Sequence, residues 1–432
     1  MSPGHDAAGS PRIRQPFPTV IRQLGWTERL FWLLDRNSPR HFVLAAQVDG
    51  HTAVEEWRQA LDAVQGRHPL LTAGIMVGED SVPYFVRAPG ASIPLRVVQG
   101  GSAGQDWEKE FARELATPVD PEQVPLMRAT LWHEPGRAVC ILSTHHSIAD
   151  GMSVAFVVRD LLQALAGATL QPLPLLPAYD DLVGQPTTSH VRQPMVAGLD
   201  LPALGRPAVY RKRDGAVPQI RMAGFVPEFV ARLRERARAE GTTVHGALCS
   251  GLALTFAQVR ERPADEPIRI WSPMDARRLL GLGDDCTLLA LSMIVPAEPR
   301  GLSGFWDVAR SVSARLAATR TVEYLGAALS LLGQSISSLQ VADAARLMAC
   351  RFPFDFVITN LGVLPYATRF GHLQLAALWG PAVLSGFEDE HVFGVTGADG
   401  GLALTYSSYT PIDSLLERLE RNLAAACADP RD

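Results

Sequence analysis

The chain has 432 residues, of which 47% are hydrophobic, and its formal net charge at neutral pH is −5. This length is sufficient for two domains of ordinary size with a substantial core. The weakly acidic balance excludes the basic surface that is typical of nucleic-acid-binding proteins. The sequence contains no run of about twenty apolar residues, so we expect no integral membrane segment.

The N-terminus and the cysteines bear on where the protein resides. Residues 1–18 are polar and contain prolines, which predicts a disordered terminus without the apolar stretch of a signal peptide. The five cysteines are scattered and odd in number, and their spacing fits neither a disulfide framework nor a metal site. We therefore expect a cytoplasmic protein that holds no metal and no bound cofactor.

In chain order, the first predicted elements are a strand over residues 41–48 and a helix that follows it. Apolar residues at positions 54, 57, 61 and 64 give this helix one apolar face, and Gly66 can end it. Residues 52–55 form a possible capping box at its start.

A hairpin is predicted next, with strands over residues 126–132 and 138–144 and a turn at residues 134–137. Apolar residues then recur at helical spacing, which predicts an amphipathic helix over residues 152–165. Residues 145–151 therefore form a strand-to-helix connection. Such connections lie at one end of a rigid scaffold, where functional groups are often found.

This connection reads HHSIADG, from His145 to Gly151. Its second histidine, His146, can act as a general base near neutral pH, because the unperturbed pKa of histidine is about 6.5. Asp150 can orient that base or brace its loop, and Gly151 lets the backbone turn where a side chain would obstruct. A histidine in a globular chain is more often a packing or surface residue, and this alternative stays open. A zinc site fits poorly, because the neighbouring histidines point apart and no nearby Cys or Glu completes the spacing.

The remainder of the chain is divided by a proline-rich segment, residues 169–218, which predicts a crossover linker. The elements predicted beyond it are helices over residues 229–238 and 243–256, strands over 268–272, 354–359, 391–395 and 402–409, and a final helix that residues 410–413 open with proline at its first position. Two halves that each mix helices and strands favour an α+β fold with sandwich domains over residues 19–168 and 219–432.

The motif at residues 145–151 resembles the HHxxxDG signature of the condensation-domain superfamily. That superfamily includes peptide-synthetase condensation domains, chloramphenicol acetyltransferase relatives and the polyketide-associated acyltransferases of actinobacteria. Four further stretches are similar to counterparts in the last group: RHPLL at residues 67–71, PLMR at 125–128, SPMDAR at 272–277 and TNLGV at 359–363. The sequence has no DFGWG run, which favours the polyketide-associated branch. The resemblance implies two chloramphenicol-acetyltransferase-like domains in a V, with a tunnel between them.

The resemblance also implies the chemistry of an acyltransferase. His146 would take a proton from a hydroxyl, or with lower preference an amine, as that group attacks the carbonyl of an acyl thioester. The thioester of coenzyme A, or of the phosphopantetheine arm of an acyl carrier protein, would be a co-substrate rather than a bound cofactor. The acceptor would be a lipid or natural product in secondary metabolism, and we expect the enzyme to be a monomer.

Other residues are implied to support His146. Asp150, which we place with His146 in the catalytic site, would brace the loop through an ion pair with Arg277 rather than touch the substrate. The alternative is that Arg277 is an ordinary surface arginine. His145 would pack behind the base, and Gly151 would shape the loop.

The TNLGV stretch allows two interpretations. Asn360 and Gly362 either shape the wall of the channel or form a plain turn at the end of a strand. The surface that would bind a partner also allows two interpretations. An acidic carrier protein would require a basic patch on this protein. The arginine-rich residues 211–213 and 232–238 are candidates for that patch, although residues 232–238 also suit the solvated face of a helix.

Two other functions remain alternatives to acyl transfer. One is a non-catalytic member of the superfamily that recruits a carrier protein or a partner enzyme. It is disfavoured because His146, Asp150 and Gly151 are all present. The other is a cyclase or epimerase that uses the same base on a tethered chain. Product mass separates these, because acyl transfer adds a group and isomerisation leaves the mass unchanged.

Overall fold

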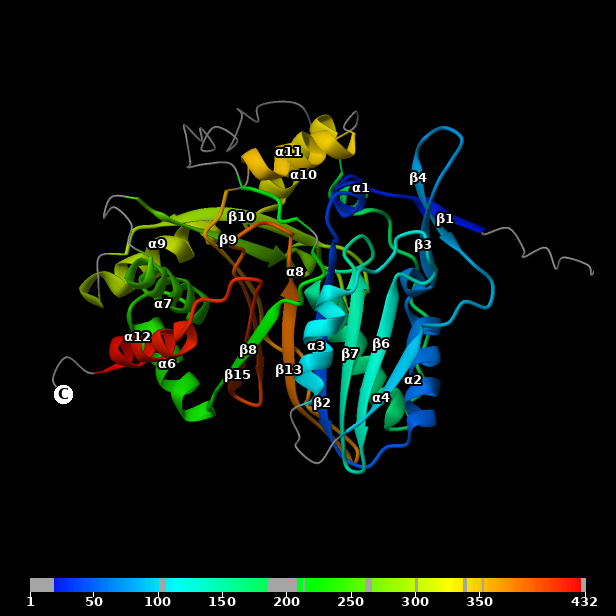
Figure 1. The fold of residues 1–432 in the computed structure, drawn as a ribbon, viewed down its shortest axis with the longest axis horizontal. Helices are drawn as coiled ribbons and strands as arrows, with labels where there is room; N and C mark the ends of the chain where they lie inside the picture. Colours follow the sequence, from blue (N-terminus) through cyan, green and yellow to red (C-terminus); the bar gives the residue numbers. More distant parts are fainter. Residues whose placement is uncertain are drawn as a thin grey trace, which may run out of the picture.

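The structure is a computed structural model that describes residues 19–100, 106–184, 208–212, 214–260, 266–299, 302–336, 340–351 and 353–428. The predicted disordered terminus, residues 1–18, lies outside the described residues, as do residues 185–207 and 213 of the predicted linker. Among the described residues, the strands form two six-stranded sheets and one three-stranded sheet. Helices cover both large sheets, and the two lobes built on these sheets lie side by side (Figure 1). The predicted α+β class with two sandwich lobes is confirmed.

The first lobe is built on a sheet with the strand order β12-β13-β2-β7-β6-β5. Its strands are β12 (Arg369–Phe370), β13 (Leu373–Val383), β2 (His41–Asp49), β7 (Arg137–His145), β6 (Met127–Glu134) and β5 (Leu95–Gln99). The predicted hairpin is present as the antiparallel pair of β6 and β7, in which Met127 lies opposite Thr144. β2 pairs with the other edge of β7, so that His41 lies opposite His145. β7 is therefore a central strand, which explains its nearly continuous apolar run.

Side chains alternate between the two faces of the sheet along each strand, and both faces carry apolar residues. Helices therefore cover both faces. α2 (Val54–Arg67) and α4 (Gly151–Leu165) pack together on one face, and α3 (Asp106–Ala116) packs on the other. Along β2, Phe42 and Leu44 belong to the core under α2 and α4, whereas Val43 and Ala45 belong to the core under α3.

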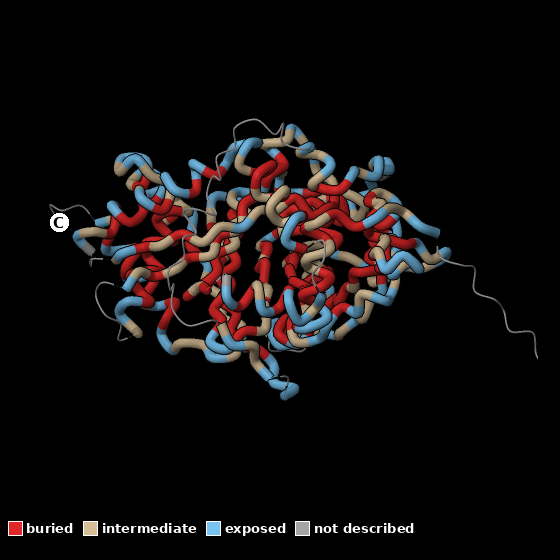
Figure 2. The backbone as a smooth tube through the Cα atoms, turned by 90° about the horizontal axis from the view of Figure 1, so that it is seen from above, coloured by how far each residue is buried: buried red, intermediate tan, exposed pale blue. Residues whose placement is uncertain are grey.

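The second lobe is built on a sheet with the strand order β10-β9-β11-β14-β15-β8. Its strands are β10 (Ala290–Ala297), β9 (Ile268–Asp275), β11 (Phe356–Val363), β14 (Val392–Ala398), β15 (Gly401–Ser408) and β8 (Gln219–Phe225). The helices packed on it are α6 (Pro227–Ala239), α7 (Val244–Val259), α9 (Phe305–Ala317) and α12 (Leu415–Cys427). Figure 2 shows buried backbone in the interior of both lobes and exposed backbone at their periphery.

The smaller elements lie around the two lobes. They are the three-stranded sheet of β1 (Thr19–Gln23), β4 (Pro83–Arg87) and β3 (Ala73–Val77), the helices α1 (Trp26–Asp35), α5 (Tyr179–Val183), α8 (Arg277–Leu280), α10 (Val322–Ile336) and α11 (Val341–Arg351), and two 3-10 turns at Pro69–Thr72 and Leu302–Gly304. α1, near the start of the chain, packs against α10 and α11 from the second half (Figure 1). Of the described helices, none is both long and apolar enough to cross a membrane.

One strand joins the two lobes and corrects the predicted domain boundary. β13 comes from the second half of the chain, yet it pairs with β2 of the first sheet. It also lies against β14 so closely that a side chain at Gly394 would overlap the backbone of Pro381. The Gly380 amide donates a hydrogen bond of 2.9 Å to the hydroxyl of Thr405 on β15. The prediction that residues 219–432 form one separate domain is therefore wrong for residues 369–383.

The cap of one predicted helix and the start of another differ from the structure. The N-cap of α2 is Ala53 rather than Thr52, and its backbone N–H donates to the carboxylate of Glu56 at 2.7 Å. The last helix begins at Leu415 with Ser414 as its N-cap, so Pro411 lies before the helix rather than at its first position.

Candidate active site

His146 lies directly after β7, on the predicted strand-to-helix connection. The backbone N–H of His146 donates to the carbonyl of Arg40 at 2.8 Å, which holds the start of the loop against the residue preceding β2. The Ile148 N–H donates to the carbonyl of His145 at 3.2 Å and closes a tight turn. α4 begins at Gly151, so the loop is short and fixed at both ends.

The tautomer of His146 follows from its one hydrogen bond. Nδ1 lies 3.2 Å from the carbonyl oxygen of Ala149, which can only accept, so Nδ1 carries the proton. Nε2 then carries the lone pair, and it has no hydrogen-bond partner among the described residues. A neutral imidazole with a free Nε2 is the form that a general base requires.

Two aromatic rings enclose the imidazole of His146. The ring of Phe31 on α1 stacks on it with centroids 4.5 Å apart, and the ring of Phe42 on β2 lies 4.4 Å away in a tilted arrangement. Burial lowers the pKa of His146 to about 3, although Ala149 and Asp150 favour the charged form. The ring is therefore neutral at physiological pH. Neither phenylalanine can be recognised from the sequence, because neither belongs to a motif.

The predicted ion pair between Asp150 and Arg277 is present and buried. Nη1 of Arg277 lies 3.0 Å from Oδ1 and 2.8 Å from Oδ2 of Asp150, and the side chains are 4% and 5% exposed. The alternative of an ordinary surface arginine is therefore wrong. Burial alone would raise the pKa of Asp150, but the charge and hydrogen bonds of Arg277 outweigh it, so the carboxyl is held below its usual pKa.

Asp150 also receives backbone hydrogen bonds from both halves of the chain. Ser153 N–H donates to Oδ1 at 2.8 Å, which makes Asp150 the N-cap of α4. Leu289 N–H donates to Oδ2 at 2.9 Å. With these donors and Arg277, the carboxylate has its acceptor sites occupied. This geometry suits a brace for the loop better than a group that reacts.

Ser153 extends this connection between the halves. Its hydroxyl donates to the carbonyl of Thr287 at 2.6 Å and accepts from Nη2 of Arg277 at 2.7 Å. The same Nη2 donates to the Thr287 carbonyl at 2.9 Å. Ser153 and Thr287 were not predicted as site residues. The serine three positions after the motif aspartate is a capping-box signal that could have identified the first of them.

Gly151 lies where both sheets approach the loop. A Cβ atom at this position would be 2.7 Å from Cγ of Pro381 on β13 and 2.9 Å from Cδ2 of Leu361 on β11. Its φ angle is not in the left-handed region. Glycine is therefore required for close packing rather than for the turn that the sequence suggested, and the loop of His146 lies at the contact between the two lobes.

His145 is fully buried. Its Nδ1 accepts a hydrogen bond of 3.1 Å from the Ser147 N–H, and its Nε2 lies 3.5 Å from Oδ1 of Asp35. His145 is thus a packed residue, and its expected place behind His146 stays a prediction.

Asn360 and Gly362 lie within β11, where the register of this strand against β14 shifts between Asn360 and Val363. The Gly362 N–H donates to Oδ1 of Asn360 at 2.8 Å, and Gly362 has a φ of +70°, in the left-handed region. The Asn360 amide also donates to Nδ1 of His245 at 3.3 Å. The two residues therefore shape an irregularity inside the strand rather than a turn beyond its end, and a role in a channel wall stays a prediction. A hollow of about 380 Å³ begins at the next residue, Val363, and is also lined by Tyr366.

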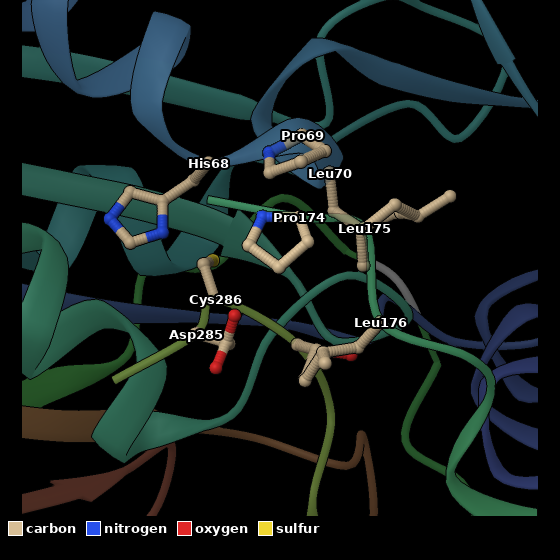
Figure 3. A pocket seen from close by; sticks show the side chains of 9 residues that line it. His68, Pro69, Leu70, Pro174, Leu175, Leu176, Asp285 and Cys286 are labelled. Atoms are coloured by element: carbon tan, nitrogen blue, oxygen red, sulfur yellow. The ribbon is translucent and has the colours of Figure 1, made fainter. Parts of the chain in front are cut away.

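A second polar cluster lies near the motif but is not suited to bind a substrate. Nε2 of the buried His68 lies 2.9 Å from Oδ2 of the buried Asp160, which Arg67 also contacts at 2.7 Å. Figure 3 shows the cavity beside His68, which Asp285 and Cys286 also line. This cavity has a volume of about 10 Å³, enough for one water molecule. The RHPLL stretch therefore has a structural part in the packing of α2 against α4.

The candidate basic patch at residues 211–213 is described only in part, whereas the one at residues 232–238 is described in full. Arg213 lies outside the described residues. Arg211 pairs with Asp214 at 2.6 Å and lies over the ring of Tyr409. Arg236 on α6 pairs with Glu240 at 2.8 Å. Both patches thus include arginines with partners of their own, and carrier-protein binding there stays a prediction.

Comparisons with known proteins agree with this fold. Residues 30–191 match the family model for the condensation domain. Bacitracin synthase 3 of Bacillus licheniformis is 26% identical over 307 residues, which are 67% of this chain and 5% of that protein. The chain therefore spans only a small part of this curated relative.

Solved structures match over nearly the whole chain. The first condensation domain of the CDA synthetase has a TM-score of 0.68 at 18% identity, covering 97% of this chain and 98% of that one. Polyketide synthase associated protein 5 from Mycobacterium tuberculosis has a TM-score of 0.65 at 18% identity, covering 96% and 100%. The architecture is thus the chloramphenicol-acetyltransferase-like one that condensation domains share. The match to the condensation-domain family over residues 30–191 and the shared fold agree with the resemblance that the HHxxxDG motif carries.

Proposed function

We propose that this protein is an acyltransferase that moves an acyl group from a thioester to a hydroxyl, in preference to an amine, of a lipid or natural product. The observation that carries the proposal is the imidazole of His146. Its Nδ1 is bonded to the Ala149 carbonyl and its Nε2 is free, at the contact between two lobes of condensation-domain architecture.

The proposed reaction requires no acyl-enzyme. Nε2 of His146 takes the proton of the acceptor hydroxyl while its oxygen forms a bond to the thioester carbonyl carbon. The tetrahedral oxyanion then collapses, the carbon–sulfur bond breaks, and the imidazolium returns the proton to the departing sulfur. The products are an ester and a free thiol, and the histidine is neutral again.

The rate enhancement comes from two sources. Thioesters are activated acyl donors, so holding donor and acceptor in the right orientation supplies much of the rate. The general base adds about 10²- to 10⁴-fold. Asp150 and Arg277 contribute indirectly, because their buried ion pair ties the loop of the base to the second half of the chain. In this proposal the donor is an acyl-CoA or an acyl carrier protein, and the product is one of secondary metabolism.

The test is a panel of acyl-CoAs and acylated carrier proteins, incubated with the purified protein with and without candidate alcohols and amines. We expect thiol release that depends on the acceptor, together with a product whose mass is that of the acceptor plus the acyl group. A product of unchanged mass would instead indicate a cyclase or epimerase. Capture of a carrier protein without thioester consumption would indicate a recruiting domain.

The matched variants are His146→Ala and His372→Ala. His372 is an exposed histidine whose Nε2 lies 3.1 Å from the carbonyl oxygen of His51. We expect His146→Ala to lower turnover by about 10²- to 10⁴-fold with an unchanged circular dichroism spectrum, and His372→Ala to behave as wild type. Turnover by His146→Ala at the wild-type rate would refute the role of the base.

A further inference from the structure

The ring of Phe31 occupies a specific place in the proposed site. Phe31 is half-buried on α1, and its ring stacks on His146 at an interplanar angle of 23°. The fully buried ring of Phe42 also contacts the imidazole, with centroids 4.4 Å apart in a tilted arrangement. The Nδ1 edge is bonded to Ala149. Two aromatic rings and one hydrogen bond thus hold the imidazole, and Nε2 is its nitrogen without a hydrogen-bond partner among the described residues.

The place of Phe31 is determined by contacts along the whole of α1. The Ser147 hydroxyl donates to the Glu28 carbonyl at 3.0 Å, which joins α1 directly to the loop of His146. At the start of the helix, Trp26 N–H donates to Oδ1 of Asp180 at 3.0 Å. α1 also packs on α10, where a side chain at Gly333 would be 2.7 Å from the indole nitrogen of Trp26. The helix that carries Phe31 is thus anchored to the loop and to the second half of the chain.

We infer that Phe31 is a positioning residue for the proposed reaction: with Phe42 it clamps the imidazole of His146, keeps water from its face, and confines the acceptor to an in-plane approach at Nε2. This inference rests on the proposed function, but its effect on the imidazole is measurable without a substrate. Clamping between two rings removes rotation about the side-chain bonds of the base. Such fixed orientation is what intramolecular catalysis depends on.

The charged surroundings of His146 do not explain its neutrality by themselves. His145 on the same loop and Arg40 before β2 disfavour the imidazolium, whereas Asp150 on the same loop favours it. Desolvation is the largest effect. Phe31 supplies the outer, half-buried part of the apolar enclosure, so its ring is the one whose removal admits water.

The first experiment measures the protonation of His146 by NMR, with histidines labelled at Cε1 and the His146 signal assigned through a His146→Gln variant. In the wild type we expect no titration of this signal between pH 4.5 and 8. In Phe31→Ala we expect a midpoint within that range, because a hydrated imidazole titrates near pH 6.5. Phe31→Leu keeps the apolar volume without the ring and should lie between the two. An unchanged His146 signal in both variants would overturn the inference.

The second experiment measures the pH dependence of turnover once a substrate pair is known. We expect a flat profile between pH 4.5 and 6.5 for the wild type, and a profile for Phe31→Ala that falls with acidity below its new midpoint, with kcat lower by roughly tenfold at pH 7.5. The control is Phe229→Leu, which alters a half-buried ring stacked on Phe225 in the other lobe. A flat profile in Phe31→Ala would count against the inference. Loss of turnover in His146→Ala bears on the proposed function alone.

Discussion

Replacing Arg277 by methionine tests whether the buried ion pair holds the halves of the chain together at the site. The variant leaves Asp150 charged and 5% exposed, with the backbone N–H groups of Ser153 and Leu289 and the Ser153 hydroxyl as its donors. Loss of one partner of a buried pair costs about 3–5 kcal/mol. Because two backbone hydrogen bonds remain, we expect about 3 kcal/mol of lost unfolding free energy. This is a large fraction of the roughly 5–15 kcal/mol that stabilises a typical protein.

The assay is urea unfolding at pH 7, followed by tryptophan fluorescence. Asp150 has a lowered pKa in the folded protein, so its contribution is present above the unfolded value of about 3.8 and is lost only in stronger acid. The control is Arg310→Met, because Arg310 is 41% exposed and pairs with Asp307 and Glu240 at the surface. Such surface pairs contribute about 0–1 kcal/mol. If Arg277→Met lost no more stability than Arg310→Met, the reasoning about the ion pair would be refuted.

Three further predictions concern acid stability and close packing. Burial lowers the pKa values of His41 and His391 to about 4, so the unfolded chain binds more protons between pH 6.5 and 4. Stability should fall as pH falls through that window, by up to about 1.4 kcal/mol per pH unit for each histidine. Glu390, whose pKa burial raises, offsets part of this loss. Equal urea midpoints at pH 7 and pH 5 would contradict the prediction, and His391→Gln should reduce the slope. Gly151→Ala places a methyl group against both lobes and should lower turnover at least tenfold with about 1–3 kcal/mol of destabilisation, measured by thiol release and urea unfolding. Gly394→Ala, which forces β13 away from β14, should destabilise the protein by a similar amount or more; a wild-type thermal midpoint would show that the strands can separate without cost.

The sequence predicts the neighbourhood of the motif well, because local signals and the resemblance agree there. The hairpin of β6 and β7 follows from two apolar runs around a turn, and α4 follows from apolar residues at helical spacing. The pairing of Asp150 with Arg277 is a contact between distant residues, and it was predictable only because the resemblance supplied it.

Contacts without a motif were not predictable in the same way. β13 contains Gly380 and Pro381, which disfavour a strand, and nothing in its apolar residues tells which sheet it joins. Phe31 is one of 16 phenylalanines, and an apolar side chain carries no signal for the partner on which its ring stacks. The cap at Ala53 shows a third limit, since a carboxylate at position 55 or 56 gives nearly the same pattern.

The low pKa of His146 has opposite consequences for the two halves of the proposed reaction. As a base, an imidazole whose conjugate acid has a pKa of about 3 has little driving force to remove the proton of an alcohol in advance, so proton transfer must accompany attack on the carbonyl. As an acid, the imidazolium gives its proton readily to a departing thiolate, whose own pKa is about 8.5. Enclosure by Phe31 and Phe42 therefore favours expulsion of the thiol and leaves the attack dependent on orientation. Because the attack depends on orientation, the loop of His146 is held by a buried ion pair, by close packing at Gly151 and by two aromatic rings. A strongly basic, exposed histidine would not need these three supports.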